Sequence, residues 1–226
     1  HIVSAVHSGN RNVCAHGDAA SFVTARKSAE YTKRLYRLDF GLRRTFMIYV
    51  FLADGFEEIE ALAPVDLLRR AGFAVQTVGV TGKTVTGSHN ISVTADILPE
   101  EVVLNEAVQA VVLPGGMPGA KNLDADETVS RAIAFAAEKG KLLCAICAAP
   151  FLLGKRGLLQ GKKAICYPGF EKDLTGAEIS EKSVCRDGSI ITAKGMGVAT
   201  EFGLKIVEAL SGEKTAAELR ATIQSV

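Results

Sequence analysis

A cysteine stands at the end of an apolar run, at a point where a buried strand would pass into a helix. The segment 141–150 reads KLLCAICAAP, so Cys147 is followed by two alanines and Pro150. Small residues permit a tight turn, and proline is favoured in the first turn of a helix. Such a turn directs a thiol toward the free N–H groups at the start of the helix, which favour a thiolate. The spacing predicts Cys147 as a nucleophile, against the alternative of a buried core cysteine.

An acidic cluster follows the first predicted strand and supplies a candidate partner for the thiol. Asp54-Gly55 ends that strand, and Glu57, Glu58 and Glu60 come soon after it. A carboxylate beside the sulfur opposes ionisation, whereas a protonated carboxyl donates a hydrogen bond to the thiolate and favours it. Glu60 is the candidate because it lies about one helical turn beyond the strand. The alternative for Glu60 is a solvated acid on the helix face, and Glu57 and Glu58 are expected to cap the helix or face solvent.

A glycine pair ends another predicted strand. Pro114-Gly115-Gly116 follows the apolar run 110–113, and glycines there let the backbone approach a ligand. The amides of Gly115 and Gly116, together with that of Ala148, could bind a developing oxyanion. The alternative is an ordinary turn.

Alternating strands and helices must position these three segments. This alternation predicts right-handed βαβ units and a doubly wound α/β fold, with a mainly parallel sheet and helices on both faces. Asp187-Gly188 adds a small β-hairpin, and the functional crevice should lie beyond the carboxyl ends of the strands. The predicted strands are 47–53, 74–80, 91–94, 110–113, 142–146, 163–166, 184–186 and 189–192, and the predicted helices are 57–71, 126–139, 148–157, 198–210 and 213–224.

Composition narrows the function classes. The chain has 226 residues, of which 48% are hydrophobic and 23% charged, enough for one large α/β domain. No apolar stretch approaches the roughly 18–20 residues of a membrane helix, so no membrane partner is expected. Basic residues concentrate in 1–46, which leaves the remainder mildly acidic and argues against nucleic acid as the main partner. Five cysteines without a secretory signal favour a reduced, cytoplasmic protein.

Residues 1–46 differ from the rest of the chain, because they show little hydrophobic periodicity and no clear core face. An Arg-rich, acid-poor segment fits an organelle presequence, or upstream sequence translated from a misplaced start. We favour the second, since Met47 opens the first convincing strand. We expect 1–46 to be a poorly ordered extension, or loosely helical around 21–38, that carries no chemistry. Residues 47–226 should form a single domain.

Four separated motifs resemble the ThiJ/PfpI superfamily, in the branch of the Parkinsonism-associated deglycase and its small bacterial relatives. They are DGFEEIE at 54–60, VLPGG at 112–116, AICAAP at 145–150 and TAKG at 192–195, within a resemblance that runs from about 47 to 225. It implies a flavodoxin-like fold, a homodimer, an easily oxidised Cys147, a protonated Glu60 beside it, and oxyanion amides from Gly116 and Ala148. Family members are described as glyoxalase III enzymes, which convert methylglyoxal to lactate without glutathione. Deglycation, redox sensing and chaperone activity are described as well.

The chain departs from the superfamily pattern near the nucleophile. Protease-like and heat-shock branches place a histidine directly after the nucleophile, where this chain has Ala148, so protease activity is not expected. The close branch often places a histidine near the thiol where this chain has Tyr167. Proton transfer would then fall to Glu60, water or Tyr167. His89 is similar in position to a basic or polar residue at the pocket entrance of relatives, or is an ordinary loop histidine.

The remaining cysteines do not suggest a second chemistry. Cys144 and Cys147 form a C-x-x-C pair, but Cys144 would lie inside the strand, so a catalytic dithiol is not expected. Cys166 and Cys185 stand alone, and no metal or cofactor is expected. The turn at 194–197 lacks phosphate-loop spacing and is expected to line the pocket. The predicted pocket residues are Gly115, Tyr167, His89 and Gly195.

These predictions together describe covalent thiol chemistry on a small reactive carbonyl. The Cys147 thiolate would attack the aldehyde of a methylglyoxal-like α-oxoaldehyde, or of its early adducts, to give a hemithioacetal. Glu60 would move the proton that leads to a thioester and then to a 2-hydroxy acid. The alternative is a redox-sensing or chaperone-like stress protein whose Cys147 is oxidised without turnover. The homodimer follows from resemblance alone, with the helix bearing Val65, Leu68 and Arg69 as a contributor.

Overall fold

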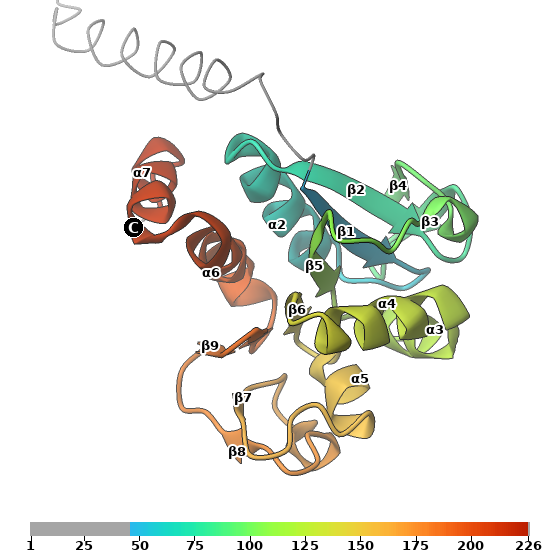
Figure 1. The fold of residues 1–226 in the computed structure, drawn as a ribbon. Coiled ribbons are helices and arrows are strands. Elements are labelled where there is room, and N and C mark those ends of the chain that lie inside the picture. Colours follow the sequence, from blue (N-terminus) through green and yellow to red (C-terminus); the bar gives the residue numbers. More distant parts are fainter. Residues whose placement is uncertain (1–45, 226) are drawn as a thin grey trace, which may run out of the picture. The chain divides into compact units, whose positions relative to one another are not determined.

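The computed structural model describes residues 46–225, and a six-stranded sheet lies at its centre (Figure 1). The strand order is β2-β1-β5-β6-β10-β9, and all neighbours are parallel except β9, which runs antiparallel to β10 at the edge. The predicted mainly parallel sheet and its hairpin are therefore confirmed. The strands are β1 (Met47–Leu52), β2 (Ala74–Gly79), β5 (Val108–Leu113), β6 (Leu142–Ile146), β9 (Val184–Asp187) and β10 (Ile190–Ala193).

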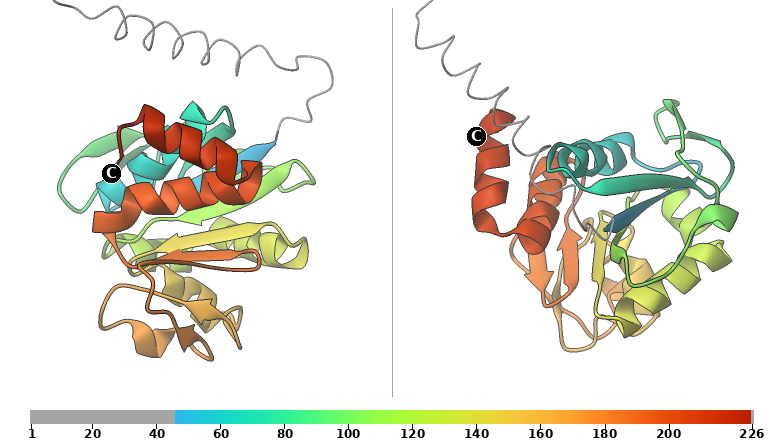
Figure 2. Two further views of the ribbon diagram at one scale, coloured as in Figure 1. Left: turned by 90° about the vertical axis from the view of Figure 1, so that its left-hand side faces the viewer. Right: turned by 45° about the horizontal axis from the view of Figure 1, so that its top comes forward.

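Helices cover both faces of the sheet because side chains alternate along each strand. In β1, Tyr49 and Phe51 belong to one hydrophobic core, whereas Ile48 and Val50 belong to the other. The first core lies under α3 (Gly119–Ala125), α4 (Glu127–Glu138) and α5 (Pro150–Lys155), and the second under α2 (Glu58–Arg70) and α6 (Ala199–Ser211). The last helix, α7 (Glu213–Thr222), packs along α6, as both views in Figure 2 show.

The parallel arrangement brings three strand ends to one edge of the sheet. Val50 of β1 pairs with Val112 of β5, and Leu113 of β5 pairs with Ala145 of β6. The segments that follow β1, β5 and β6 therefore begin at nearly the same level. These segments contain the three motifs from which the sequence predicts a site, and the carboxyl edge of a parallel sheet is the usual place for one.

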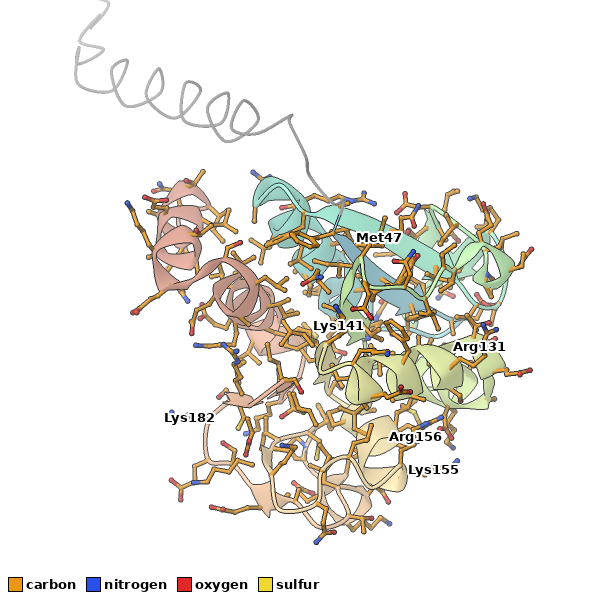
Figure 3. The ribbon with its side chains drawn as sticks, viewed as in Figure 1. Met47, Arg131, Lys141, Lys155, Arg156 and Lys182 are labelled. Atoms are coloured by element: carbon orange, nitrogen blue, oxygen red, sulfur yellow. The ribbon has the colours of Figure 1, made fainter. Side chains whose placement is uncertain are left out.

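An ion cluster at the C-terminal end of α5 stabilises the helix that follows the turn after β6. Arg156 donates to Asp124 Oδ1 of α3 and to Ser130 Oγ of α4, at 2.8 Å in both cases. Lys155 donates to Asp124 Oδ2 at 2.7 Å, and Figure 3 shows Lys155 and Arg156 side by side on α5. Because Asp124 is largely buried, the cluster ties three helices of one face together and fixes α5.

Several short elements were not predicted. The helix α3 and the strand β3 (Thr84–Thr86) are among them. The strand β3 pairs in a separate hairpin with β4 (Ser92–Thr94), which confirms the strand predicted at 91–94. The predicted strand 163–166 is reduced to β7 (Lys163–Ala164), which pairs with β8 (Glu178–Ile179). It ends there because the next amide, that of Ile165, donates to the side chain of Thr192 at 2.9 Å instead of to a strand. Short 3₁₀ turns occur at Pro99–Glu101, Glu171–Asp173 and Met196–Val198.

The five predicted helices are all present, with small changes at their ends. The largest change concerns 148–157, which shortens to Pro150–Lys155. Among the residues described, no helix is long and apolar enough to cross a bilayer. The predicted extension 1–46 lies outside the described residues apart from Phe46, whose side chain is exposed.

Candidate active site

Cys147 occupies a sharp turn between β6 and α5. Its φ is +63°, a left-handed conformation that is uncommon for a residue with a side chain. Its N–H donates to the carbonyl of Ala193 at 2.9 Å, and its carbonyl accepts from the N–H of Tyr167 at 2.8 Å. The side chain is partly buried and packs against both hydrophobic cores. The fold therefore holds this backbone conformation from two sides and places the thiol where the two cores meet.

Two backbone amides face the sulfur. The N–H groups of Gly116 and Ala148 hydrogen-bond the Cys147 side chain and lower its pKa. Gly116 has a φ of +86°, and a Cβ at this position would lie 2.4 Å from the backbone nitrogen of Glu57. A side chain is thus excluded at Gly116 both by conformation and by space. The structure brings the two predicted oxyanion donors together at Cys147, while their catalytic role stays a prediction.

Glu60 lies buried beside the thiol, in the first turn of α2. Its side chain is 1% exposed, and Oε2 accepts a hydrogen bond from the N–H of Gly115 at 3.0 Å. A Cβ on Gly115 would lie 2.6 Å from Glu60 Oε2 and 2.7 Å from Cys147 Cβ. Gly115 therefore leaves the space in which the carboxyl and the cysteine meet. The second carboxyl oxygen, Oε1, is buried and has no hydrogen-bond partner among the residues described.

The ionisations of Cys147 and Glu60 oppose each other. Burial raises the pKa of Glu60 to about 7, although hydrogen bonding to Cys147 and to the Gly115 amide lowers it in part. Burial also raises the pKa of the Cys147 thiol to about 12, followed by the negative charge of Glu60. The two amides at the sulfur do not outweigh these effects while Glu60 is ionised. A protonated Glu60 removes the opposing charge and offers a donor, so the thiolate depends on a neutral Glu60.

The expectation that Glu58 caps the helix or faces solvent is wrong. Its side chain is 5% exposed, and Oε1 accepts hydrogen bonds from the N–H of His89 at 2.8 Å and of Ile91 at 3.4 Å. Its partners come from the β3–β4 loop, about thirty residues later in the chain. Glu57 is the N-cap residue of α2, but its side chain makes no capping hydrogen bond.

His89 lies on the β3–β4 loop and contacts the acidic start of α2. Its Nδ1 is 3.0 Å from Glu58 Oε2 and 3.3 Å from Glu57 Oε2. Ligand atoms of these three side chains lie within 4.8 Å of one another, a spacing that a metal ion can bridge. Because each already has a hydrogen-bonding partner there, we assign the group as an ion cluster. The hydrogen bonds that the structure gives His89 reach Glu58 and Ser88, not Cys147.

Tyr167 and Gly195 lie at the outer side of Glu60. A Cβ on Gly195 would be 3.3 Å from Cδ2 of the Tyr167 ring and 3.9 Å from Glu60 Oε1. The Tyr167 side chain is 51% exposed. Gly195 therefore lies next to the unpartnered carboxyl oxygen, and the partly exposed Tyr167 ring lies next to Gly195.

Two methionines near the site were missed by the sequence analysis. Met117 and Met196 are 40% and 49% exposed, and each directly follows a glycine of the site, Gly116 or Gly195. The Met196 amide also lowers the pKa of Glu60. Their position directly after the two glycines could have identified them from the sequence as residues near the site.

The other described cysteines are less accessible. Cys144 lies inside β6, as expected, and is 0% exposed; burial raises its pKa well above the ordinary value. Cys166 is 1% exposed, and burial raises its pKa to about 12. The thiol of Cys185 donates to the carbonyl of Lys163 at 3.4 Å. Of the cysteines that the structure describes, Cys147 is the one that is not fully buried.

Known proteins resemble this chain over most of its length. Residues 47–209 match the DJ-1/PfpI family. The chain is 36% identical to the Parkinson disease protein 7 homolog of Danio rerio over 178 residues, 77% of this chain and 94% of that protein. It is 32% identical to the glutathione-independent glyoxalase DJR-1.2 of Caenorhabditis elegans over 162 residues, 70% of this chain and 86% of that protein. The solved structure of oxidized DJ-1 from Toxoplasma gondii matches with a TM-score of 0.75 at 36% identity, covering 79% of this chain and 98% of that one.

Proposed function

Because this chain belongs to the DJ-1/PfpI family, we propose that it is a glutathione-independent glyoxalase that uses Cys147 as its nucleophile. A curated relative carries the name of that activity, so a glyoxalase-type activity is supported at the level of the family. The proposal rests on the surroundings of the Cys147 sulfur. The cysteine lies in a left-handed turn, two backbone amides hydrogen-bond its sulfur, and a buried carboxyl whose pKa is about 7 lies beside it.

The first step is attack of the Cys147 thiolate on the aldehyde carbon of methylglyoxal. A C–S bond forms, the C=O π pair moves to oxygen, and the amides of Gly116 and Ala148 stabilise that oxyanion. Since the same amides hydrogen-bond the free sulfur, the oxygen bound to the attacked carbon develops close to donors that are already in place. Glu60, neutral while the sulfur is a thiolate, gives its proton to the oxyanion, which yields the hemithioacetal and leaves Glu60 as a carboxylate.

Glu60 then moves a proton between the two carbons. As a carboxylate it removes the C1 proton to give an enediol, and as a carboxylic acid it returns a proton to C2, which yields a thioester of lactate. A pKa of about 7 lets the same group serve in both forms near neutral pH. Water hydrolyses the thioester, releasing lactate and the free thiol, so methylglyoxal and water balance lactate without an external oxidant. The scheme uses only these side chains, backbone amides and water.

The same chemistry extends to early adducts of glyoxals on amines. Such an adduct retains a carbon that a thiolate can attack and a neighbouring carbon that can receive the proton. The C–N bond of the adduct breaks as the C–S bond forms, and the amine leaves with a proton, which gives the same hemithioacetal as methylglyoxal. We include this deglycase activity in the proposal as a second substrate class of the same site.

A lactate assay without glutathione tests the proposal. Cys147→Ala should abolish turnover of methylglyoxal, and Glu60→Gln should lower kcat by about 10²–10⁴-fold, the usual contribution of a general acid–base. Cys185→Ala is the matched control, since this buried thiol lies on β9 and contacts Lys163; it should leave turnover within about twofold of wild type. Turnover that persists in Cys147→Ala would refute the scheme.

A redox role of the same cysteine is the second candidate function. The two amides at the sulfur would also stabilise the oxygens of a sulfinate, and the related structure from Toxoplasma gondii is described as oxidized. Peroxide treatment followed by intact-mass measurement tests it. A gain of about two oxygen atoms, absent in Cys147→Ala, together with no lactate formation by wild type, would favour the sensor over the enzyme.

We also propose a homodimer to which the helix α2 contributes, as predicted from the resemblance, although two of the residues named on that helix do not reach its surface. Val65 and Leu68 are buried in the core of their own chain. The exposed apolar side chain of α2 is Ile59, at 47%, and Ile91 on the β3–β4 loop is 54% exposed. Both adjoin Glu58, which precedes Ile59 and accepts the Ile91 amide. Light scattering on wild type and on an Ile59→Lys, Ile91→Lys double variant would show whether this surface forms the dimer.

A further inference from the structure

Three exposed segments that adjoin the site carry no charged side chain, in a chain of which 23% of the residues are charged. They are 116–118, 167–169 and 195–197, which read Gly-Met-Pro, Tyr-Pro-Gly and Gly-Met-Gly. Their large side chains, Met117, Tyr167 and Met196, are 40%, 51% and 49% exposed, and we call these three side chains the apolar rim. Methionine, proline and glycine side chains have no hydrogen-bond donor, so the Tyr167 hydroxyl is the one side-chain donor of these segments.

The backbone fixes each rim residue beside a reacting group. The amide that precedes Met117 hydrogen-bonds the Cys147 sulfur, which places the Met117 Cα within about 9 Å of that sulfur. The amide of Met196 lowers the pKa of Glu60 through a hydrogen bond, so it lies close to that carboxyl. The amide of Tyr167 donates to the Cys147 carbonyl at 2.8 Å. The three rim side chains therefore begin next to the sulfur, the carboxyl and the turn, and reach the surface there.

Gly195 leaves space between the rim and the carboxyl. A Cβ there would be 3.3 Å from Cδ2 of the Tyr167 ring and 3.9 Å from Glu60 Oε1, which has no hydrogen-bond partner among the described residues. This space is thus at contact distance from both an aromatic ring and the group that moves the proton. The negative charge of Glu57 reaches Glu60, whose pKa it raises, so it also disfavours a carboxylate on a substrate bound there. The position suits an uncharged, apolar group.

We propose that the apolar rim selects the substrate by its ketone substituent, so that the site favours α-oxoaldehydes bearing an aromatic or branched apolar group over methylglyoxal. The inference rests on the proposed function and names its substrate class. In the hemithioacetal the first carbon is bound to the Cys147 sulfur, and Glu60 must reach both carbons. The substituent on the second carbon then extends past Glu60 toward the rim, where methionine and aromatic side chains give it adaptable apolar contacts.

Alkylation of Cys147 by iodoacetamide and by N-benzyl-iodoacetamide tests the rim without turnover. Both reagents form a thioether with loss of iodide, and the benzyl group hangs from the carbonyl next to the attacked carbon, as the substituent of an α-oxoaldehyde does. Because both consume the same thiolate, the ratio of their rates cancels the ionisation of the sulfur. In the full chain, followed by mass at the Cys147 peptide, the double variant Met117→Gln, Met196→Gln should lower the ratio of benzyl to parent reagent by about 10-fold. Glutamine keeps the length of methionine and adds a polar amide.

Turnover of two substrates measures the same preference. Phenylglyoxal would give mandelate where methylglyoxal gives lactate. The double variant should lower kcat/KM for phenylglyoxal relative to methylglyoxal by a similar factor, mainly through KM, because the rim contacts are made in the bound substrate as well as in the transition state. Its kcat for methylglyoxal should stay within about twofold of wild type.

Val103→Gln is the matched control. Val103 is also an exposed apolar residue, at 59%, but its carbonyl accepts from the Tyr49 hydroxyl and it belongs to none of the three segments, so both ratios should stay unchanged. An unchanged alkylation ratio in the double variant overturns the proposal. An equal fall in Val103→Gln also overturns it, because any polar substitution on the surface would then have the effect. If the alkylation ratio falls but neither lactate nor mandelate forms, the glyoxalase scheme fails and the rim stands.

Discussion

At the scale of single residues, the state of the site depends on whether the Cys147 thiol or the Glu60 carboxyl holds the proton. Both groups are partly or wholly buried, so each resists ionisation, and the charge of Glu60 also opposes ionisation of the thiol. The structure gives the sulfur two amide donors but gives Glu60 Oε2 only one, and leaves Oε1 without a partner among the described residues. A buried carboxyl oxygen without a donor favours the protonated acid. These contacts act against the order of the two pKa values, about 7 for Glu60 and about 12 for Cys147, and favour a neutral acid beside an anionic sulfur.

A substitution at Gly115 tests whether the close contact between Glu60 and Cys147 is needed for catalysis. In Gly115→Ala the new methyl group would overlap Glu60 Oε2 and Cys147 Cβ, so the two side chains must separate by a few tenths of an ångström or more. We expect kcat for methylglyoxal to fall by about 10²-fold, the usual cost of misplaced catalytic groups. Gly197→Ala is the matched control, because a Cβ there meets nothing within 4 Å. Equal kinetics for the two variants would contradict the assigned contact.

Glu60 should also make stability depend on pH. Its pKa lies at about 7 in the folded chain against an ordinary value of 4.5. Between these two values the unfolded carboxyl has lost its proton while the folded one keeps it, so the free energy of unfolding falls as pH rises through this window. Below the window both states are protonated and the penalty is absent. The fall is about 3 kcal/mol at most.

Denaturant unfolding of wild type and Glu60→Gln at both ends of that window measures this effect. The glutamine variant should gain up to about 3 kcal/mol relative to wild type on going from the acid to the neutral end. Glu201→Gln serves as the comparison, because the hydrogen bond from Arg220 lowers the pKa of Glu201, so this carboxyl is ionised in both states through most of the window and its difference from wild type should change little there. A constant difference between Glu60→Gln and wild type would show that Glu60 does not hold its proton.

At the scale of elements, the site depends on the segment that follows the short strand β7. The chain after β7 stops pairing as a strand, and the amide of Ile165 donates to Thr192 Oγ1 in β10 instead. Two residues later the amide of Tyr167 donates to the carbonyl of Cys147. Thr192 is 1% exposed, so its hydroxyl is a buried link between β10 and the segment that supports the nucleophile from outside.

Replacement of this hydroxyl should affect both stability and catalysis. Thr192→Val keeps the shape but leaves a buried N–H without an acceptor, which costs about 1–3 kcal/mol. Loss of this hydrogen bond should also loosen the segment from Ile165 to Tyr167, whose amide supports Cys147, and we expect kcat to fall for that reason. Ile191→Val, on the neighbouring position of β10, should cost about 0.5–1.5 kcal/mol without changing kcat. Urea unfolding and the lactate assay separate these outcomes, and an unchanged kcat in Thr192→Val would argue against the link.

At the scale of the whole molecule, patterns within one segment were predictable and contacts between distant segments were not. The parallel sheet, the helices on both faces and the turn at Cys147 follow from strand–helix alternation and small residues, which are local signals. The burial of Glu58 was missed because its partners are about thirty residues away. The helix α3 was missed because its seven residues bury only Gly119, Ala120 and Leu123, too few for a period. The strand β3 was missed because it has only three residues.

The first 46 residues provide a test at this scale. Among the described residues, both hydrophobic cores are built from residue 47 onward, and the family match begins at Met47. We therefore expect a chain that begins at Met47 to keep its melting temperature within about 2 °C, less than the shift that 1 kcal/mol would cause, and to keep its kcat. Calorimetry and the lactate assay on the shortened and full chains check this. A large loss in either would assign a structural or catalytic role to the extension.

The position of Cys147 at the junction of both cores has a further consequence. Whatever becomes attached to that sulfur, an acyl group, an oxygen pair or a reagent, must be accommodated by the two layers together. The melting temperature of the protein should therefore change when a group is attached to the Cys147 sulfur. Thermal shift measurements could then rank candidate substrates and oxidants by the adducts they leave, before any product has been identified.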